Sequence, residues 1–163
     1  MATQFQDDVV FLGATNFVGM PQLKAGCVGN TDIEAAAGIA ASKLEHPVYA
    51  CYGQSGAAVA ATVPIHTVVG ATGVIESVKV GSIVACTGNA EITVDVKKNG
   101  TTVLSAAIVL DSTNTARIAE SGTLSVTALV AGDLLEVVVA VNAGTGALGT
   151  GLFVQVKSRE DAA

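Results

Sequence analysis

The stretch of the sequence that decides the fold is EITVDVKKNGTTV, at residues 91–103. Its first half alternates apolar and polar residues, which is the period of an extended strand with one buried face. Ile92, Val94 and Val96 fall on one face, and polar or charged side chains fall on the other. These residues therefore predict a strand that covers a hydrophobic core.

A tight turn follows this strand at Asn99-Gly100. Both residues tolerate the positive φ that a type I′ turn requires, and this dipeptide between alternating segments is a strong hairpin signal. A two-residue turn here would place Val96 opposite Val103 and Ile92 opposite Ala107. The sequence therefore predicts an antiparallel hairpin with that register.

The same pattern continues from residue 48 onwards, in short segments separated mostly by Gly, Asn, Ser or Asp. Several short strands at this spacing are typical of two packed sheets. The predicted strands are 48–52, 57–69, 73–86, 90–98, 101–110, 115–119, 123–129, 134–142 and 148–157. We predict an all-β fold, an antiparallel β-sandwich or jelly roll, as a domain over residues 48–163.

One predicted strand, around residues 134–141, is apolar on both faces. Leu135, Val137 and Val139 share one face, while Leu134 and Val138 lie on the other. Such a strand is either central, under a covering element, or part of an interface between subunits. Both interpretations remain open at this stage.

Residues 1–47 have a different character, which predicts an extended N-terminal attachment arm with one or two short helices. Thr31 and Glu34 have the spacing of a capping box before an alanine run, and Pro47 would end a second helical turn. The apolar segments of the arm are too short to form a core, so we expect them to be ordered by packing on a larger body. The candidate contact residues with the capsid or a neighbouring subunit, as interpreted below, are Val9, Val10, Phe11, Leu12, Phe17, Val18, Met20, Ile39 and Leu44.

Composition favours an assembly component. Charged residues make up 13% of the chain, about half of the ~25% usual for a soluble domain. Much of this weakly polar surface would be covered by neighbouring subunits; the alternative is a protein rich in small residues that is simply uncharged outside. The net charge of −6 argues against a nucleic-acid partner, which requires clustered Lys and Arg.

Other features of the sequence bear on location. The chain begins without the basic and apolar regions of a signal peptide, and no apolar run approaches the ~20 residues that cross a bilayer. We therefore expect synthesis in a cytoplasm and no membrane partner. Cys27, Cys51 and Cys86 are widely spaced and odd in number, so they predict neither a disulfide framework nor a zinc site.

The motifs that resemble chemistry have structural interpretations. Residues 144–149, GTGALG, match the dinucleotide-binding spacing, but the residues that follow alternate as a strand instead of opening a helix, which favours a hairpin loop. His46 and His66 stand without a nearby metal-ligand partner and are interpreted as structural. We expect no catalytic residues, no metal and no cofactor, and hence no enzyme.

Three stretches carry a resemblance to a known class of protein: DIEAAAGIAASKLEH at 32–46, DVKKNGTTVL at 95–104 and LVAGDLL at 129–135. They resemble elements of tailed-bacteriophage virion structural proteins, in the order of a short helical element followed by a jelly roll. The resemblance implies a capsid decoration or cement protein, or a head-fibre type, on the virion surface. It also implies a homotrimer whose N-terminal region attaches to the major capsid protein and neighbouring copies.

Two alternatives remain beside this interpretation. The same resemblance fits a phage fibre or baseplate module, although the chain has no fibrous repeat. A carbohydrate-binding jelly roll belongs to another functional class, but the chain has no Trp and only Tyr49 and Tyr52 to stack on sugars.

Overall fold

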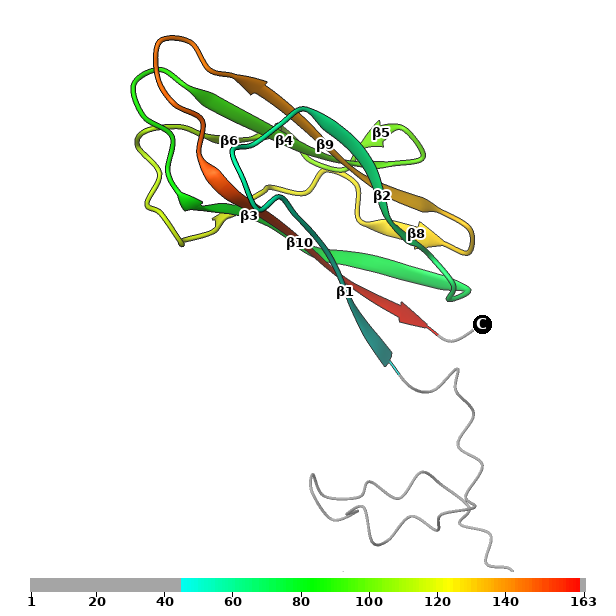
Figure 1. The fold of residues 1–163 in the computed structure, drawn as a ribbon. Coiled ribbons are helices and arrows are strands. Elements are labelled where there is room, and N and C mark those ends of the chain that lie inside the picture. The colour runs from blue at the N-terminus through cyan, green and yellow to red at the C-terminus, as the bar shows by residue number, and fades with distance from the viewer. Residues whose placement is uncertain (1–44, 162–163) are drawn as a thin grey trace, which may run out of the picture. The chain divides into compact units, whose positions relative to one another are not determined.

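The computed structural model describes residues 45–161, and every regular element in that range is a β-strand (Figure 1). The strands are β1 (Glu45–Gly53), β2 (Ala61–Thr67), β3 (Thr72–Val84), β4 (Glu91–Lys98), β5 (Thr101–Thr102), β6 (Ile108–Leu110), β7 (Glu120–Ser121), β8 (Ala128–Val130), β9 (Leu134–Asn142) and β10 (Thr150–Asp161). The all-β prediction is confirmed for this part of the chain. The predicted arm up to residue 44, with all nine candidate contact residues, lies outside the described residues, whereas residues 45–47 of that arm belong to β1.

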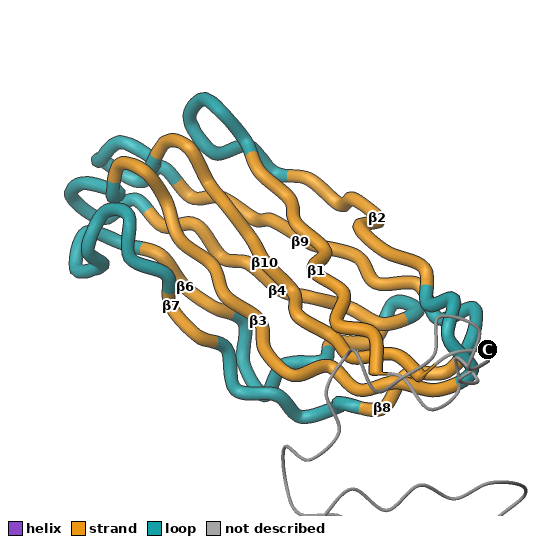
Figure 2. The backbone as a smooth tube through the Cα atoms, turned by 90° about the horizontal axis from the view of Figure 1, so that it is seen from below, coloured by secondary structure: helices purple, strands orange, loops and turns teal. Residues whose placement is uncertain are grey.

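The strands form two antiparallel sheets that pack face to face, as the two layers in Figure 1 show. Figure 2 views the same strands from below, so that the two sheets overlap. Sheet A has the order β1-β10-β3-β7, and β8 also pairs with β3. Sheet B has the order β2-β9-β4-β5, and β6 also pairs with β4. The β-sandwich prediction is therefore confirmed.

The strand order is that of a jelly roll. Both β5 and β6 pair with β4, and both β7 and β8 pair with β3, so each couple acts as one interrupted strand. Counted this way there are eight strands, in which the first pairs with the last, the second with the seventh, the third with the sixth and the fourth with the fifth. This is a long antiparallel hairpin rolled into two sheets, which is the double Greek-key arrangement.

The core lies between the sheets and follows the alternation of the sequence. In β4, Ile92, Val94 and Val96 are fully buried. From the facing sheet, β10 buries Leu152, Val154 and Val156. Burying side chains of this size stabilises a fold by roughly 1.5–3 kcal/mol each relative to leaving them in water.

The predicted hairpin is confirmed at its turn, and its register is wrong further along. Asn99 and Gly100 have φ values of 50° and 82°, as a type I′ turn requires. The N–H of Val103 donates to the carbonyl of Val96 at 2.9 Å, so these two residues lie opposite each other as predicted. Ile92, however, lies opposite Leu110 rather than Ala107.

The shift arises because three extra residues are accommodated between β5 and β6. There the chain leaves β4 and pairs elsewhere: Leu104 forms an isolated bridge with Leu124, and the N–H of Ser105 donates to the carbonyl of Thr123. Leu104 is buried as a result. A long-range contact therefore overrides the register that the turn alone would set.

The strands predicted at 115–119 and 123–129 are largely wrong. Residues 115–119 contain no strand: Ala116 and Arg117 form a turn, with Arg117 at a φ of 68°. The N–H of Asp111 donates to the side-chain oxygen of Asn114 nearby. Of the second segment, only its end at Ala128 and Leu129 belongs to a strand. These residues connect short strands at the edges of the two sheets.

The strand that is apolar on both faces, β9, is central in sheet B, between β2 and β4. Its inner face buries Leu135, Val137 and Val139, and its outer face carries Leu134, Val138 and Ala140, which are half-buried or exposed. No described element covers this outer face. The interpretation as a subunit interface therefore stays open.

Candidate functional site

The two ends of the sandwich differ, and the chain enters at one of them. Glu45, the first residue of β1, pairs with Asp161, the last residue of β10. The short turns after β2, β4 and β8 lie at this same end, which we call the arm end (Figure 1). The connections 54–60, 85–90, 111–119 and 143–149 lie at the opposite end, which we call the loop end.

At the arm end, two of the motifs behind the phage resemblance contact each other. The side-chain amide of Asn99 donates to Asp133 Oδ1 at 2.7 Å, and Asn99 Oδ1 accepts the N–H of Leu134 at 2.9 Å. Asp133 Oδ2 accepts the N–H of Val130 at 2.9 Å and lies 3.5 Å from Lys98 Nζ. Chiefly because of the Val130 hydrogen bond, the pKa of Asp133 lies below its usual range.

This contact explains why the two motifs occur together. One supplies the turn between β4 and β5, and the other supplies the turn between β8 and β9. Each turn satisfies backbone groups of the other, so the pair fixes the arm end of sheet B. The two motifs therefore hold two turns of the jelly roll together, and their contacts are structural rather than catalytic.

A second polar contact at the arm end joins His66 and Glu160. Glu160 is buried, and its Oε2 accepts the N–H groups of Val69 at 3.1 Å and Gly70 at 3.0 Å, while Oε1 contacts His66 Nε2. Burial favours the neutral carboxyl, but the hydrogen bonds from Gly70, His66 and Val69 outweigh it and hold the pKa of Glu160 below its usual value. The pair ties the end of β2 to the end of β10.

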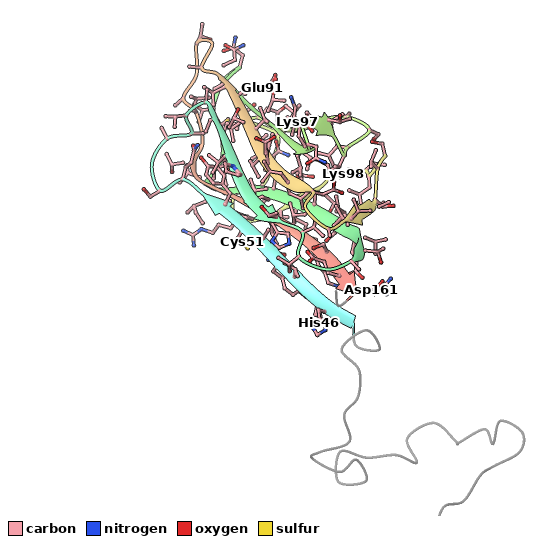
Figure 3. The ribbon with its side chains drawn as sticks, turned by 90° about the vertical axis from the view of Figure 1, so that its right-hand side faces the viewer. His46, Cys51, Glu91, Lys97, Lys98 and Asp161 are labelled. Carbon is pink, nitrogen blue, oxygen red and sulfur yellow. The ribbon has the colours of Figure 1, made fainter. Side chains whose placement is uncertain are left out.

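This arrangement gives His66 a defined structural partner, which no motif in the sequence indicates. His46 is exposed on β1, and Figure 3 shows it near Asp161 at the arm end. Among residues 45–161, no group of three or more His, Cys, Asp or Glu side chains could hold a metal ion. The interpretation of both histidines as structural stays a prediction.

At the loop end, the glycine-rich segment 143–149 is a loop, but it does not close a hairpin. It joins β9 in sheet B to β10 in sheet A. The N–H and hydroxyl of Thr145 both donate to Asn89 Oδ1, at 2.6 and 2.9 Å. A Cβ on Gly146 would lie 1.7 Å from the carbonyl oxygen of Thr87, so only glycine fits there. A strand follows rather than a helix, so the loop lacks the helix N-terminus that binds phosphate.

The loop end is also poor in charge. Its four connections contain two charged residues, Asp111 and Arg117. Asp111 is engaged within its own loop, where Oδ1 accepts hydrogen bonds from the backbone and hydroxyl of Thr113. Val59 and Ile118 are exposed there. This end therefore presents small, uncharged and partly apolar side chains to the surroundings.

The two described cysteines differ in environment. Cys51 lies on β1 (Figure 3) and is exposed, whereas Cys86 is buried. The Cys86 sulfur accepts the N–H of Gly149 at 3.2 Å and contacts the Leu110 carbonyl at 3.5 Å. Cys86 therefore joins the loop end to the core, whereas Cys51 has no comparable contact among the described residues.

Comparison with known proteins assigns neither a family nor a function to this chain. No family model and no curated protein matches the chain. One solved structure, of Desmodium yellow mottle tymovirus, is 11% identical and aligns over 97% of this chain and 96% of its own, with a TM-score of 0.34. A score this low does not establish a shared fold, so this likeness carries no argument about function. No helix among the described residues is long and apolar enough to span a membrane.

Proposed function

We propose that this protein is a non-enzymatic structural component of a tailed-phage virion, which decorates or cements the capsid surface. The observation that carries the proposal is the difference between the two ends of the jelly roll. The described chain enters the sandwich at Glu45 of β1, at the arm end, while the four connecting loops lie at the other end. Jelly rolls occur in viral capsid proteins, and also in lectins and cupins.

In this proposal the two parts of the chain have separate tasks. The arm, residues 1–47, contacts the major capsid protein and neighbouring copies through its apolar residues, such as Phe11 and Phe17. The sandwich is held with its arm end towards the capsid, and the loop end projects outwards. The assembled form is a homotrimer, the protein resides on the virion after synthesis in the host cytoplasm, and it requires no cofactor or nucleic acid.

A carbohydrate-binding module is the alternative from another class, and the positions of the tyrosines disfavour it. Tyr49 is exposed on the outer face of sheet A, whereas Tyr52 is half-buried against the core and its hydroxyl accepts a hydrogen bond from Gln54. The two rings therefore do not form a shared stacking platform. A fibre or baseplate location is compatible with the same fold and is separated from decoration by the experiment below.

The test compares the full chain with a variant that lacks residues 1–44. Both are purified, their β-structure is checked by circular dichroism, and each is mixed with undecorated capsids of the same phage. We expect the full chain to co-sediment with capsids and the truncated chain to remain in solution. Near-native binding by the truncated chain would place attachment on the sandwich, and failure of the full chain to bind would favour a fibre or baseplate module.

Point variants refine this test. Phe11→Asp and Phe17→Asp place a charge on apolar positions of the arm and should weaken capsid binding. Thr3→Asp adds the same charge at a polar position of the arm and serves as the matched control. Equal loss of binding in all three variants would indicate a general charge effect and contradict the proposed apolar contact.

A further inference from the structure

The turn between β4 and β5 contains a chemically reactive pair of residues, Asn99 and Gly100. This is the one Asn-Gly step in the sequence, and every other asparagine precedes Phe, Thr or Ala. In an Asn-Gly step the backbone nitrogen of the glycine can attack the Cγ of the asparagine side chain, because glycine has no side chain that hinders the approach. The sequence therefore places its most labile amide in this turn.

The reaction has two steps and consumes only water. In the first step the Gly100 nitrogen forms a bond with Asn99 Cγ, the Cγ–Nδ2 bond breaks, and Nδ2 leaves as ammonia with the proton that the Gly100 nitrogen gives up. The product is a five-membered succinimide ring. In the second step water adds to one of the two ring carbonyls and opens the ring, either to aspartate or to isoaspartate, in which the chain runs through the former side chain. The net change replaces an amide by a carboxylic acid, without an oxidant or a cofactor.

The turn is open to the water that this reaction consumes. Asn99 and Gly100 are both exposed, and a Cβ added to Gly100 would meet nothing within 4 Å. Figure 3 shows Lys97 and Lys98 on the strand that leads into the turn, at the surface of the sandwich. Burial therefore does not protect Asn99, and any protection has to come from the conformation of the turn and from its hydrogen bonds.

The conformation of the folded turn holds the two reacting atoms apart. Asn99 has a φ of 50°, the left-handed conformation of a type I′ turn. In this conformation the Gly100 nitrogen is directed away from Asn99 Cβ, whereas a five-membered ring closes only when that nitrogen lies on the same side as Cβ. Ring closure therefore requires rotation about the Cα–C bond of Asn99, and this rotation opens the turn.

The turn between β8 and β9 supplies a second restraint on the same residue. The N–H of Asn99 donates to the carbonyl of Leu134 at 2.9 Å, and the N–H of Leu134 donates to Asn99 Oδ1 at 2.9 Å. Asn99 Nδ2, the nitrogen that would leave, donates to Asp133 Oδ1 at 2.7 Å. Asp133 is itself buried and accepts the N–H of Val130, so it is a fixed partner. Both polar atoms of the reactive amide are therefore held by a turn that lies 34 positions along the chain.

We propose that Asn99 is a latent deamidation site, which the contact with Asp133 and Leu134 keeps closed in the folded protein. The contact controls the reaction because opening the turn between β4 and β5 has to break the hydrogen bonds of Asn99. A hydrogen bond to a charged acceptor is the strongest of them, so loss of the Asp133 carboxylate should speed the reaction about tenfold or more. This inference does not rest on the proposed function, because it concerns the isolated chain.

Deamidation would also remove the contact that restrains it. The new carboxylate at position 99 would lie within hydrogen-bond distance of the Asp133 carboxylate, and the donor that joined the two side chains would be gone. Two carboxylates at this distance repel each other. The isoaspartate product, in addition, lengthens the backbone of a two-residue turn by one atom. The modification therefore separates the two turns at the arm end, and refolding does not reverse it.

The test measures the rate of deamidation at Asn99 in the full chain, by peptide mass spectrometry during incubation in mildly alkaline buffer. We expect the native chain to react at least about tenfold more slowly than the chain unfolded in urea, and Asp133→Ala to react at least about tenfold faster than the native chain. Glu160→Ala is the matched control, because it loosens the other polar contact of the arm end without touching Asn99. Circular dichroism checks that each variant keeps its β-structure.

Three results would overturn the inference: equal rates in the native and unfolded chains, an unchanged rate in Asp133→Ala, or equal acceleration by Glu160→Ala. If Asp133→Ala does not fold, Asp133→Asn decides, because it keeps one acceptor oxygen and should give a smaller acceleration in the same direction. Asn99→Asp reproduces one product and should lower the urea midpoint of unfolding. Asn142→Asp, at an exposed position of the loop end whose side-chain oxygen accepts the N–H of Gly144, should leave it unchanged. An Asn99→Asp variant as stable as the native chain would contradict the separation of the two turns.

Discussion

Replacing Glu160 by Ala should destabilise the sandwich by about 3 kcal/mol. The change leaves the N–H groups of Gly70 and Val69 without their acceptor, and the Gly70 group is buried. An orphaned buried donor costs about 1–3 kcal/mol. Val69 lies nearer to solvent, and His66 is half-buried, so water recovers part of their hydrogen bonding. The buried N–H of Gly70 therefore accounts for the largest share of the expected loss.

The assay is urea unfolding followed by far-ultraviolet circular dichroism, with Asp161→Ala as the matched control. Asp161 is the next residue on β10, is exposed, and accepts a hydrogen bond from the Thr72 hydroxyl. Its replacement should change the free energy of unfolding by no more than about 0.5 kcal/mol. Equal effects of the two substitutions would refute the reasoning that the buried acceptor matters.

The pH dependence gives a second measurement on the same residue. Because the pKa of Glu160 is lowered in the folded state, its ionised form contributes stability that is fully present above the ordinary pKa of a glutamic acid. This contribution is lost as pH falls through the lower, folded-state pKa. The native chain should therefore exceed Glu160→Gln in stability at neutral pH, and the difference should shrink in acid. A difference that is constant with pH would contradict this assignment.

Two further substitutions test the packing of the sandwich. Gly146→Ala should destabilise the protein in thermal unfolding, because the new Cβ would clash with the Thr87 carbonyl, whereas Gly56→Ala meets nothing within 4 Å and should be nearly neutral. Ile92→Ala should lower the free energy of unfolding by about 2–5 kcal/mol, because it empties a fully buried position. Val109 lies on the neighbouring β6 and is exposed, so Val109→Ala should lower the free energy of unfolding much less, as measured by urea unfolding. Equal losses of stability in the two variants would contradict the assignment of Ile92 to the buried face and Val109 to the outer face of sheet B.

Local patterns predicted the parts of the fold that local interactions determine. The alternation in β4 and the Asn99-Gly100 turn are properties of adjacent residues, and both are confirmed. The register at Ile92 was wrong because Leu104 finds its partner at Leu124, twenty positions along the chain. The edge strands β7 and β8 are two and three residues long, which is too short for alternation to be recognised.

The sequence alone does not predict the polar contacts at the arm end. His66 and Glu160 are 94 positions apart, and neither belongs to a motif that would connect them. Asn99 and Asp133 each belong to a recognisable motif, but nothing in the sequence indicates that the two turns contact each other. The candidate contact residues of the arm lie outside the described residues, so they stay predictions.

The pairing of β1 with β10 has a consequence for how the protein is made. A ribosome releases β1 long before β10, so sheet A cannot be completed until the last strand has emerged. Contacts between residues so far apart in sequence close slowly, and all-β folds of this type are among the slower folders. Until then β1 exposes both of its edges, and an unpaired strand edge is a site of aggregation. Sheet A therefore forms only after the whole chain has been synthesised, when β10 pairs with β1. Self-association of the folded protein has to follow that pairing.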